Sequence, residues 1–264
     1  MASAREWMGK LLLRTPKPLR SLRGVPLLGD WAHRLSRRFV PSNEKVWAQV
    51  EAGPARGLWL ELDPRTGRDY LRGAAESAVQ KVLAERLHPG MVFYDLGANI
   101  GLFSLLAARL VGPEGRVFSF EPDAVVAERL RRNIARNEFS NATVVESGVW
   151  SAACRVKFVP AGASSPDHGT GRLVEGTSIE GISIPCVALD DFVERAPAPD
   201  AIKCDVEGAE VEVLRGAGKL LASRHPWIVC EMHSQANARA CREIFTRFGY
   251  SIENIDESHV LAVT

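Results

Sequence analysis

The amino-acid sequence predicts an α/β protein with a central, mostly parallel sheet of seven strands, helices on both faces and an antiparallel last strand. From residue 91 onward, short apolar runs typical of buried strands alternate with longer amphipathic segments. This alternation is typical of parallel strands joined by right-handed crossovers. Two further runs, at residues 250–255 and 259–263, are close enough in sequence to close the sheet as a hairpin. A chain of 264 residues is long enough for one such domain and an appendage.

The first forty residues form a basic N-terminal extension. They hold nine Lys or Arg against two acidic residues, a net charge of +7, which leaves −6 for the rest of a chain whose net charge is +1. Apolar and basic residues interleave at Trp7, Met8 and Leu11–Leu13 and again from Trp31 to Phe39, as in weak interfacial helices. This pattern predicts that the extension is a docking element for an anionic membrane surface or for a partner enzyme. An arm packed on the acidic domain and a homodimer contact stay open.

The expected organisation has three parts. Residues 1–45 form the basic extension, residues 46–75 a lead-in of short strands and turns, and residues 76–264 the main domain. In the lead-in, the runs at 46–50 and 57–62 are expected to be strands, because apolar and polar residues alternate in the second and a proline follows it.

Apolar periodicity predicts the order of elements in the main domain. Strands are expected at residues 91–94, 115–120, 143–146, 200–205 and 227–232. Helices are expected at residues 74–87, 99–110, 123–137, 209–221 and 236–248. A separate hairpin, 153–159 with 182–188, flanks residues 161–181, whose glycines and serines predict either a mobile loop near the site or a passive surface loop.

Composition narrows the class of protein and its setting. Five widely spaced cysteines form no C-x-x-C pair, which argues against a zinc or redox motif and favours a reduced, cytoplasmic setting. No apolar run is long enough to predict a transmembrane helix, so any membrane contact is expected to be peripheral. The near-neutral charge balance predicts no nucleic-acid partner.

Residues 95–101, with the sequence Asp-Leu-Gly-Ala-Asn-Ile-Gly, join the first parallel strand to the next helix. Glycines there let the backbone approach a ligand, and the helix offers free N–H groups. The dinucleotide pattern G-x-G-x-x-G fails, because Asn99 stands where its second glycine would be. An acid before the loop suits a ligand with an ammonium group and a sulfonium better than a diphosphate. The candidate binding residues of this loop are Asp95, Gly97, Ala98, Asn99 and Gly101.

Two further strand ends are expected at the same edge of the sheet. The second strand ends in Glu121-Pro122, and a carboxylate there can accept the hydroxyls of a ribose. After the third strand, Gly148 and Val149 offer a small and an apolar residue to bracket an adenine. Because the carboxyl ends of parallel strands form the ligand crevice of such sheets, these residues predict an adenosine site.

The fourth strand ends in Lys203-Cys204-Asp205, and alternation places Lys203 and Asp205 on one face. A lysine in an apolar strand needs a partner, because an isolated buried charge is costly; we expect that partner to be Glu231. Asp205 is a candidate for both binding and catalysis. Glu207, which follows it, either stabilises the next helix through its dipole or takes part in chemistry.

Over roughly residues 70–235, the chain resembles the FkbM family of S-adenosylmethionine (SAM)-dependent methyltransferases. The matching segments are Glu76, Asp95–Gly101, Glu121-Pro122, Ile184-Pro185, Leu189-Asp190, Lys203–Glu210 and Glu231–His233. The resemblance implies a Rossmann-like class I methyltransferase fold, SAM as methyl donor with S-adenosylhomocysteine as product, and usually a hydroxyl acceptor on a sugar, polyketide or glycan. Residues 1–45 inherit nothing from it, since the N-terminal regions of the family vary.

The predicted reaction is therefore O-methylation, with Asp205, Glu207 and His233 as candidate catalytic residues. A carboxylate can orient or deprotonate a hydroxyl, and His233 is the stronger base on general grounds. Methylation of an amine or a carboxylate stays open, as does a catalytically silent SAM-binding or scaffold protein. Three close carboxylates could also hold Mg²⁺, but no further ligands stand out in the sequence, and no metal is expected.

Overall fold

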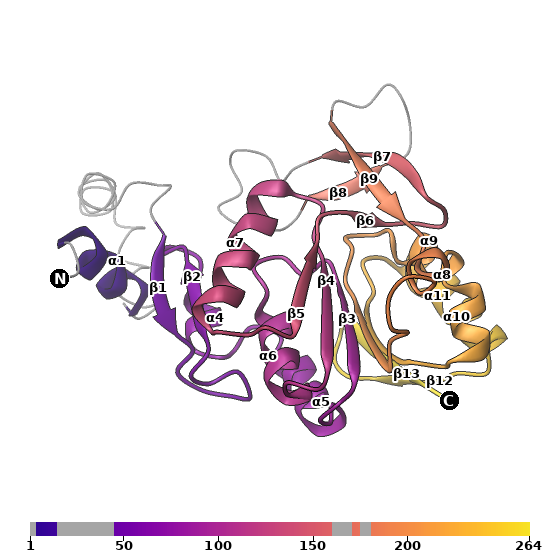
Figure 1. Ribbon diagram of the computed structural model, residues 1–264, viewed down its shortest axis with the longest axis horizontal. Helices are drawn as coiled ribbons and strands as arrows, with labels where there is room; N and C mark the ends of the chain where they lie inside the picture. Colours follow the sequence, from indigo (N-terminus) through magenta and orange to yellow (C-terminus); the bar gives the residue numbers. More distant parts are fainter. Residues whose placement is uncertain (1–3, 15–44, 160–170, 175–180) are drawn as a thin grey trace. The chain divides into compact units, whose positions relative to one another are not determined.

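The computed structural model describes residues 4–14, 45–159, 171–174 and 181–264. The chain divides into two compact units, residues 1–75 and 76–264. The two units can be followed in Figure 1, which colours the chain along its sequence. The predicted second interfacial segment, Trp31 to Phe39, lies outside the described residues. None of the described helices is long and apolar enough to cross a membrane.

The first unit holds a helix and a two-stranded antiparallel sheet. Its elements are α1 (Ala4–Arg14), β1 (Val46–Gln49), β2 (Trp59–Leu62) and α4 (Arg68–Leu71). Helix α1 packs against β1 through Gly9, where a Cβ would stand 2.6 Å from Cγ1 of Val46. Leu13 is buried, whereas Trp7 and Leu11 are exposed by 62% and 51%. The helix expected around Trp7 is therefore present, with two of its large apolar side chains facing solvent.

The second unit is built on a seven-stranded sheet with the order β12-β13-β11-β10-β3-β4-β5. Its strands are β3 (Val92–Leu96), β4 (Arg116–Phe120), β5 (Ala142–Val145), β10 (Ala201–Cys204), β11 (Trp227–Glu231), β12 (Ser251–Asn254) and β13 (His259–Val263). Strands β3, β4, β5, β10 and β11 are parallel, and β13 runs antiparallel to both of its neighbours. The predicted sheet and its antiparallel last strand are confirmed.

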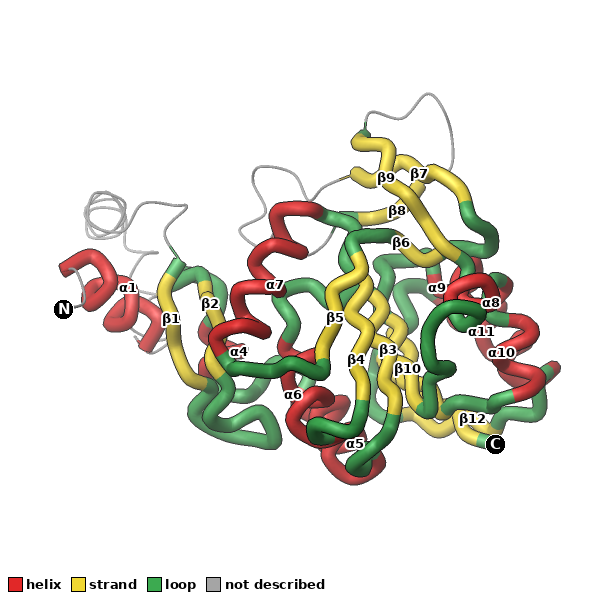
Figure 2. Tube along the Cα trace, in the orientation of Figure 1, coloured by secondary structure: helices red, strands yellow, loops and turns green. Residues whose placement is uncertain are grey.

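Helices cover both faces of this sheet, with α5, α6 and α7 on one side and α9, α10 and α11 on the other (Figure 2). Their bounds are α5 (Ser77–Arg86), α6 (Leu102–Val111), α7 (Ala124–Arg136), α8 (Leu189–Phe192), α9 (Glu210–Arg215), α10 (Gly218–Ser223) and α11 (Gln235–Arg247). Between sheet and helices, Tyr94, Phe120 and Phe192 pack edge to face or tilted, with ring centroids 4.9–5.7 Å apart. Large aromatic side chains thus fix the position of the central strands.

A second sheet of four strands follows β5, in the order β6-β9-β7-β8. Its strands are β6 (Gly148–Val149), β7 (Cys154–Val159), β8 (Arg172–Val174) and β9 (Ile182–Val187). The antiparallel pairing of β7 with β9 confirms the hairpin predicted there. Part of the loop expected at 161–181 is instead strand β8, paired with β7. Residues 160–170 and 175–180 of that loop lie outside the described residues.

The single helix predicted at 209–221 is wrong, because the chain forms two short helices, α9 and α10. Asp190 supplies the reason. Its carboxylate accepts the backbone N–H groups of Lys219 and Leu220 at 2.9 Å each, and so caps a new helix start. The backbone N–H of Asp190 donates to the carbonyl of Gly216 at 2.9 Å, in the break between the two helices. A residue far away in sequence thus restarts the helix.

Candidate active site

Asp95 lies near the carboxyl end of β3 and is fully buried. Ser104 Oγ, on α6, donates to its Oδ2 at 2.6 Å. Its other oxygen, Oδ1, is buried with no hydrogen-bond partner among the described residues. Burial raises the pKa of this carboxyl group. The unpaired oxygen marks a place where a donor or a cationic group of a ligand would be stabilised.

The loop after Asp95 turns sharply, and its backbone is held by the neighbouring strand. Gly97 and Asn99 adopt positive φ values of 77° and 49°. The N–H groups of Gly97 and Ala98 both donate to the carbonyl of Phe120, at 3.0 and 2.9 Å. A Cβ at Gly97 would overlap the carbonyl oxygen of Asp205, so this glycine also lets the loop pack directly on the end of β10. Helix α6 starts at Leu102, three residues later than expected.

Glu121 follows β4 and contacts the same loop. Its Oε2 accepts the backbone N–H of Asn99 at 2.9 Å, and its Oε1 accepts that of Asp123 at 2.9 Å. Burial raises the pKa of Glu121 to about 7. Pro122 and Asp123 then lead into α7, where Asp123 caps the helix through the N–H groups of Val125 and Val126. Each oxygen of Glu121 keeps a second acceptor site for a ligand hydroxyl.

Gly148 and Val149 lie on β6, which pairs with β9 in the second sheet rather than continuing β5. Val149 is 1% exposed and belongs to the hydrophobic core. The exposed carboxylate just before them, Glu146, pairs with Arg131 at 2.8 Å. The structure places Gly148 and Val149 beyond the end of β5, and their role beside an adenine stays a prediction.

Lys203 lies on β10, next to the strand that carries this loop. Strand β10 pairs with β3, and the Cα of Lys203 lies opposite the Cα of Asp95. Its side chain is 3% exposed and its Nζ lies 2.9 Å from Asp205 Oδ2 and 4.8 Å from the ring centroid of Phe103. Burial acts to lower the Lys203 pKa, but the carboxylates of Asp205, Glu76 and Asp95 outweigh it and raise that pKa. The prediction that Glu231 pairs with Lys203 is wrong, because the observed partner of Lys203 is Asp205.

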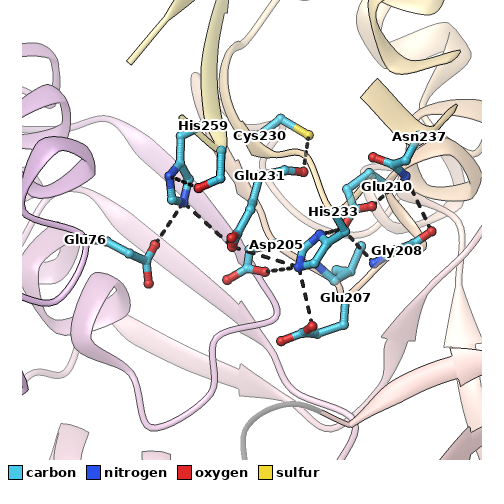
Figure 3. A network of polar contacts seen from close by, with 12 residues as sticks. Glu76, Asp205, Glu207, Gly208, Glu210, Cys230, Glu231, His233, Asn237 and His259 are labelled. Atoms are coloured by element: carbon cyan, nitrogen blue, oxygen red, sulfur yellow. Dashed lines mark hydrogen bonds and ion pairs between the residues drawn. The ribbon is translucent and has the colours of Figure 1, made fainter. Parts of the chain in front are cut away.

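His233 stands at the centre of a ring of carboxylates just past β11 (Figure 3). Its Nδ1 lies 3.0 Å from Glu210 Oε1, and its Nε2 lies 3.4 Å from Glu207 Oε2 and 3.6 Å from Asp205 Oδ1. Hydrogen bonds to Glu207 and Glu210 raise the pKa of His233 to about 11. The structure thus brings together all three residues predicted as catalytic. In this arrangement the imidazole is protonated at neutral pH.

Glu210 holds the turn that carries Glu207. Its side chain is fully buried, and Oε1 accepts the backbone N–H groups of Val206 and Gly208 at 3.2 and 3.1 Å. Its Oε2 accepts from Asn237 Nδ2 at 2.8 Å. Burial acts to raise the pKa of Glu210, but the hydrogen bond to His233 and those to the backbone lower it. Glu207 itself has φ 54°, a left-handed conformation uncommon for glutamate.

His259, Glu76 and Glu231 were not among the site residues predicted from the sequence. Figure 3 shows Glu231 beside Asp205, with His259 next to Glu231 and Glu76 next to His259. The antiparallel register of β13 puts His259 opposite Glu231, and His259 Nε2 lies 3.3 Å from Glu76 Oε2. Burial, followed by the charge of Asp205, raises the pKa of Glu231 to about 7. The signal for His259 was weak, because it depends on the pairing of a late hairpin.

The residues in and around the β3 loop have the chemical groups that SAM binding needs. Asp95 presents a buried, unpaired oxygen, Gly97 and Asn99 shape the backbone, and Glu121 presents a carboxylate one strand away. Lys203 and His233, with the surrounding carboxylates, lie along the same edge at the ends of the paired strands β10 and β11. The β3 loop and this polar cluster are thus adjacent, an arrangement that group transfer between two bound molecules requires. Fold and site define a SAM-dependent methyltransferase of the Rossmann-like class.

Comparisons with known proteins agree with this class. The Methyltransferase FkbM domain matches residues 95–252. The hexuronic acid methyltransferase AglP of Haloferax volcanii is 30% identical over 245 residues, which cover 89% of this chain and 88% of that protein. The 31-O-demethyl-FK506 methyltransferase FkbM of Streptomyces tacrolimicus is 31% identical over 222 residues, with 74% and 80% covered.

A solved structure shares the fold. The crystal structure of a methyltransferase FkbM from Methylobacillus flagellatus superposes with a TM-score of 0.50 at 19% identity, over 78% of this chain and 56% of that one. The chain belongs to the FkbM family of methyltransferases.

Proposed function

We propose that this protein transfers a methyl group from SAM to a hydroxyl oxygen of a sugar, polyketide or glycan-type acceptor. The observation that carries the proposal is the ring of Asp205, Glu207 and Glu210 around His233, next to the Gly97 loop. A hydroxyl needs its proton removed as the new bond forms, and this ring offers carboxylates beside a cationic donor. Two similar proteins are named as a hexuronic acid methyltransferase and a 31-O-demethyl-FK506 methyltransferase.

SAM, when bound, supplies a methyl group already activated on a sulfonium sulfur. Asp95, the backbone of Gly97 to Gly101, and Glu121 with Pro122 would hold it. Asp95 offers its unpaired Oδ1, and the carboxylate of Glu121 offers free acceptor sites to ribose hydroxyls. The β3 loop thus serves binding and leaves the chemistry to β10 and β11.

On the acceptor side, Glu207 is the residue that we assign to take the hydroxyl proton. Its side chain is 31% exposed, against 18% for Asp205 and none for Glu210, so it is the most accessible carboxylate of this ring. Asp205 is engaged by Lys203 and would orient the acceptor. His233, protonated between these carboxylates, would position Glu207 and Asp205 through its Nε2–H, in place of the base role that the sequence favoured.

The test uses SAM with a deuterated methyl group and a panel of sugar, uronic acid and polyketide alcohols. Mass spectrometry and NMR then locate the label. Label on a hydroxyl oxygen is expected, with Glu207→Gln reducing turnover at least about 100-fold, in line with the loss of a general base. The control variant Glu243→Gln, an exposed position on α11, should keep full turnover. Label found on nitrogen or a carboxylate, or normal turnover by Glu207→Gln, would refute the assignment.

A further inference from the structure

Glu76, Glu231 and His259 bring two carboxylates and one imidazole together from elements far apart in sequence. Glu76 precedes α5, Glu231 ends β11, and His259 opens β13. His259 Nε2 lies 3.3 Å from Glu76 Oε2 and 3.7 Å from Glu231 Oε2 (Figure 3). One possible ligand atom from each residue lies within 4.8 Å of the others. The three residues therefore form one compact N/O cluster.

The atoms at the centre of this cluster are buried, and their contacts with one another within the described residues lack hydrogen-bond geometry. Neither His259 Nε2 nor Glu76 Oε2 has a hydrogen-bond partner among the described residues, and both are inaccessible to solvent. The side chain of His259 is 5% exposed. A buried polar atom without a hydrogen bond is costly in a folded protein, and such an atom often marks an absent ion or ligand. These two atoms lie 3.3 Å apart, as an ion pair when the imidazole carries a proton, and a cation that takes the place of that proton would bind both of them.

Asp256 fixes the imidazole in the orientation that this position needs. Its Oδ1 and Oδ2 lie 2.9 and 3.1 Å from His259 Nδ1, and its Oδ1 also accepts the backbone N–H of His259 at 2.8 Å. Ser258 Oγ lies 3.1 Å from the same Nδ1. Metal-binding histidines usually have a carboxylate on the ring nitrogen that does not bind the metal, which leaves the other nitrogen turned toward the ion.

We propose that Glu76, Glu231 and His259 bind a divalent first-row transition-metal cation. One imidazole nitrogen with two carboxylate oxygens suits Mn²⁺ or Zn²⁺ better than Mg²⁺ or Ca²⁺, which prefer oxygen ligands alone. The cation also offsets negative charge, since Asp205 lies beside this cluster (Figure 3). Three protein ligands leave coordination positions for water. An acceptor oxygen would take one of them, a point that rests on the proposed function.

The experiment measures metal binding by the full chain after treatment with a chelator, in the absence of SAM. Free Mn²⁺ is followed by its electron paramagnetic resonance signal. We expect one Mn²⁺ per chain, displaced by Zn²⁺ but not by excess Mg²⁺. Glu76→Gln and His259→Gln should each weaken binding at least about 100-fold, and Asp256→Asn about 10- to 100-fold. The control variant His88→Gln, at an exposed position, should bind as the wild type does.

Several outcomes would overturn the site. They are a wild-type protein that binds neither Mn²⁺ nor Zn²⁺, and Mn²⁺ binding that survives both Glu76→Gln and His259→Gln. Loss of binding in His233→Gln alone would also overturn it, because the ion would then lie at Asp205, Glu231 and His233. If His259→Gln fails to fold, Glu76→Gln at the half-buried start of α5 gives the same test. The readout needs no methyl transfer, so a failure of the proposed function leaves this result unaffected.

Discussion

Replacing Lys203 by methionine is expected to lower the free energy of unfolding at pH 7 by about 3–5 kcal/mol, the usual cost of removing one partner from a buried ion pair. The lysine side chain is 3% exposed, and its Nζ lies 2.9 Å from Asp205 Oδ2. Methionine retains most of the apolar packing against Phe103, so the loss comes from the uncompensated carboxylates. For a unit of this size, the loss corresponds to a fall in Tm of roughly 6–20 °C.

The loss should shrink as the pH falls. In the wild type, burial acts to raise the pKa of Asp205, but Lys203 outweighs it and holds that pKa below the usual value. Asp205 therefore stabilises the wild-type fold above about pH 4, and this contribution is lost as the pH falls through the folded-state pKa. In Lys203→Met the lysine no longer opposes burial, so the Asp205 pKa should rise above its unfolded value. The resulting destabilisation is present above the raised pKa and is relieved below it.

Urea unfolding at pH 7 and pH 5, followed by tryptophan fluorescence, measures both effects. Lys219→Met, at an exposed position on α10, is the matched control and should change stability little. The double variant Lys203→Met/Asp205→Asn should recover part of the loss, because the unpaired charge is removed as well. A loss under about 1 kcal/mol, or a loss that is the same at both pH values, would refute the reasoning.

Three other predictions concern the two subsites. In urea unfolding, Gly97→Ala should destabilise the fold more than Gly90→Ala. Both glycines have a positive φ (77° and 87°), but only a Cβ at position 97 would overlap the described backbone. Equal losses of stability would argue against close packing of the loop on β10. Glu121→Ala should weaken SAM binding by about 1–3 kcal/mol in calorimetry. Because burial raises the pKa of Glu121 to about 7, wild-type affinity should rise with pH through that value as the carboxylate ionises, and a flat profile would contradict a ribose contact. The pKa of His233, raised to about 11 by hydrogen bonds to two glutamates, predicts no histidine ionisation in the pH–rate profile near neutrality; a limb that disappears in His233→Gln would be the contrary result.

The order of elements was readable from the sequence because apolar periodicity and the glycine loop are local signals. The neighbouring positions of Asp95 and Glu121 could be predicted for that reason: each lies at or just after the end of a buried strand, and parallel strands bring their carboxyl ends to one edge. The start of α6 was placed too early, because an amphipathic pattern does not reveal that Asn99 has a positive φ. The break between α9 and α10 was missed because its cap, Asp190, comes from another part of the chain.

The partners within the site were harder to predict than its members. Lys203 needed a carboxylate, and the predicted partner was Glu231 on the neighbouring strand, whereas the observed partner is Asp205, two residues away. Side-chain direction at the end of a strand decides between them, and alternation alone does not supply it. His259 joined the site through the register of an antiparallel hairpin, in which Glu231 is its partner. Such register depends on packing across the whole sheet and leaves little trace in a local pattern.

The most direct test of the account is a crystal structure of the protein with S-adenosylhomocysteine. We expect the product on the β3 loop, with its ribose hydroxyls within hydrogen-bond distance of Glu121 and its ammonium group near Asp95. Its sulfur should face the ring formed by Asp205, Glu207 and His233. A nucleoside bound away from Glu121, or a sulfur turned from that ring, would contradict the placement of donor and acceptor along this edge of the sheet.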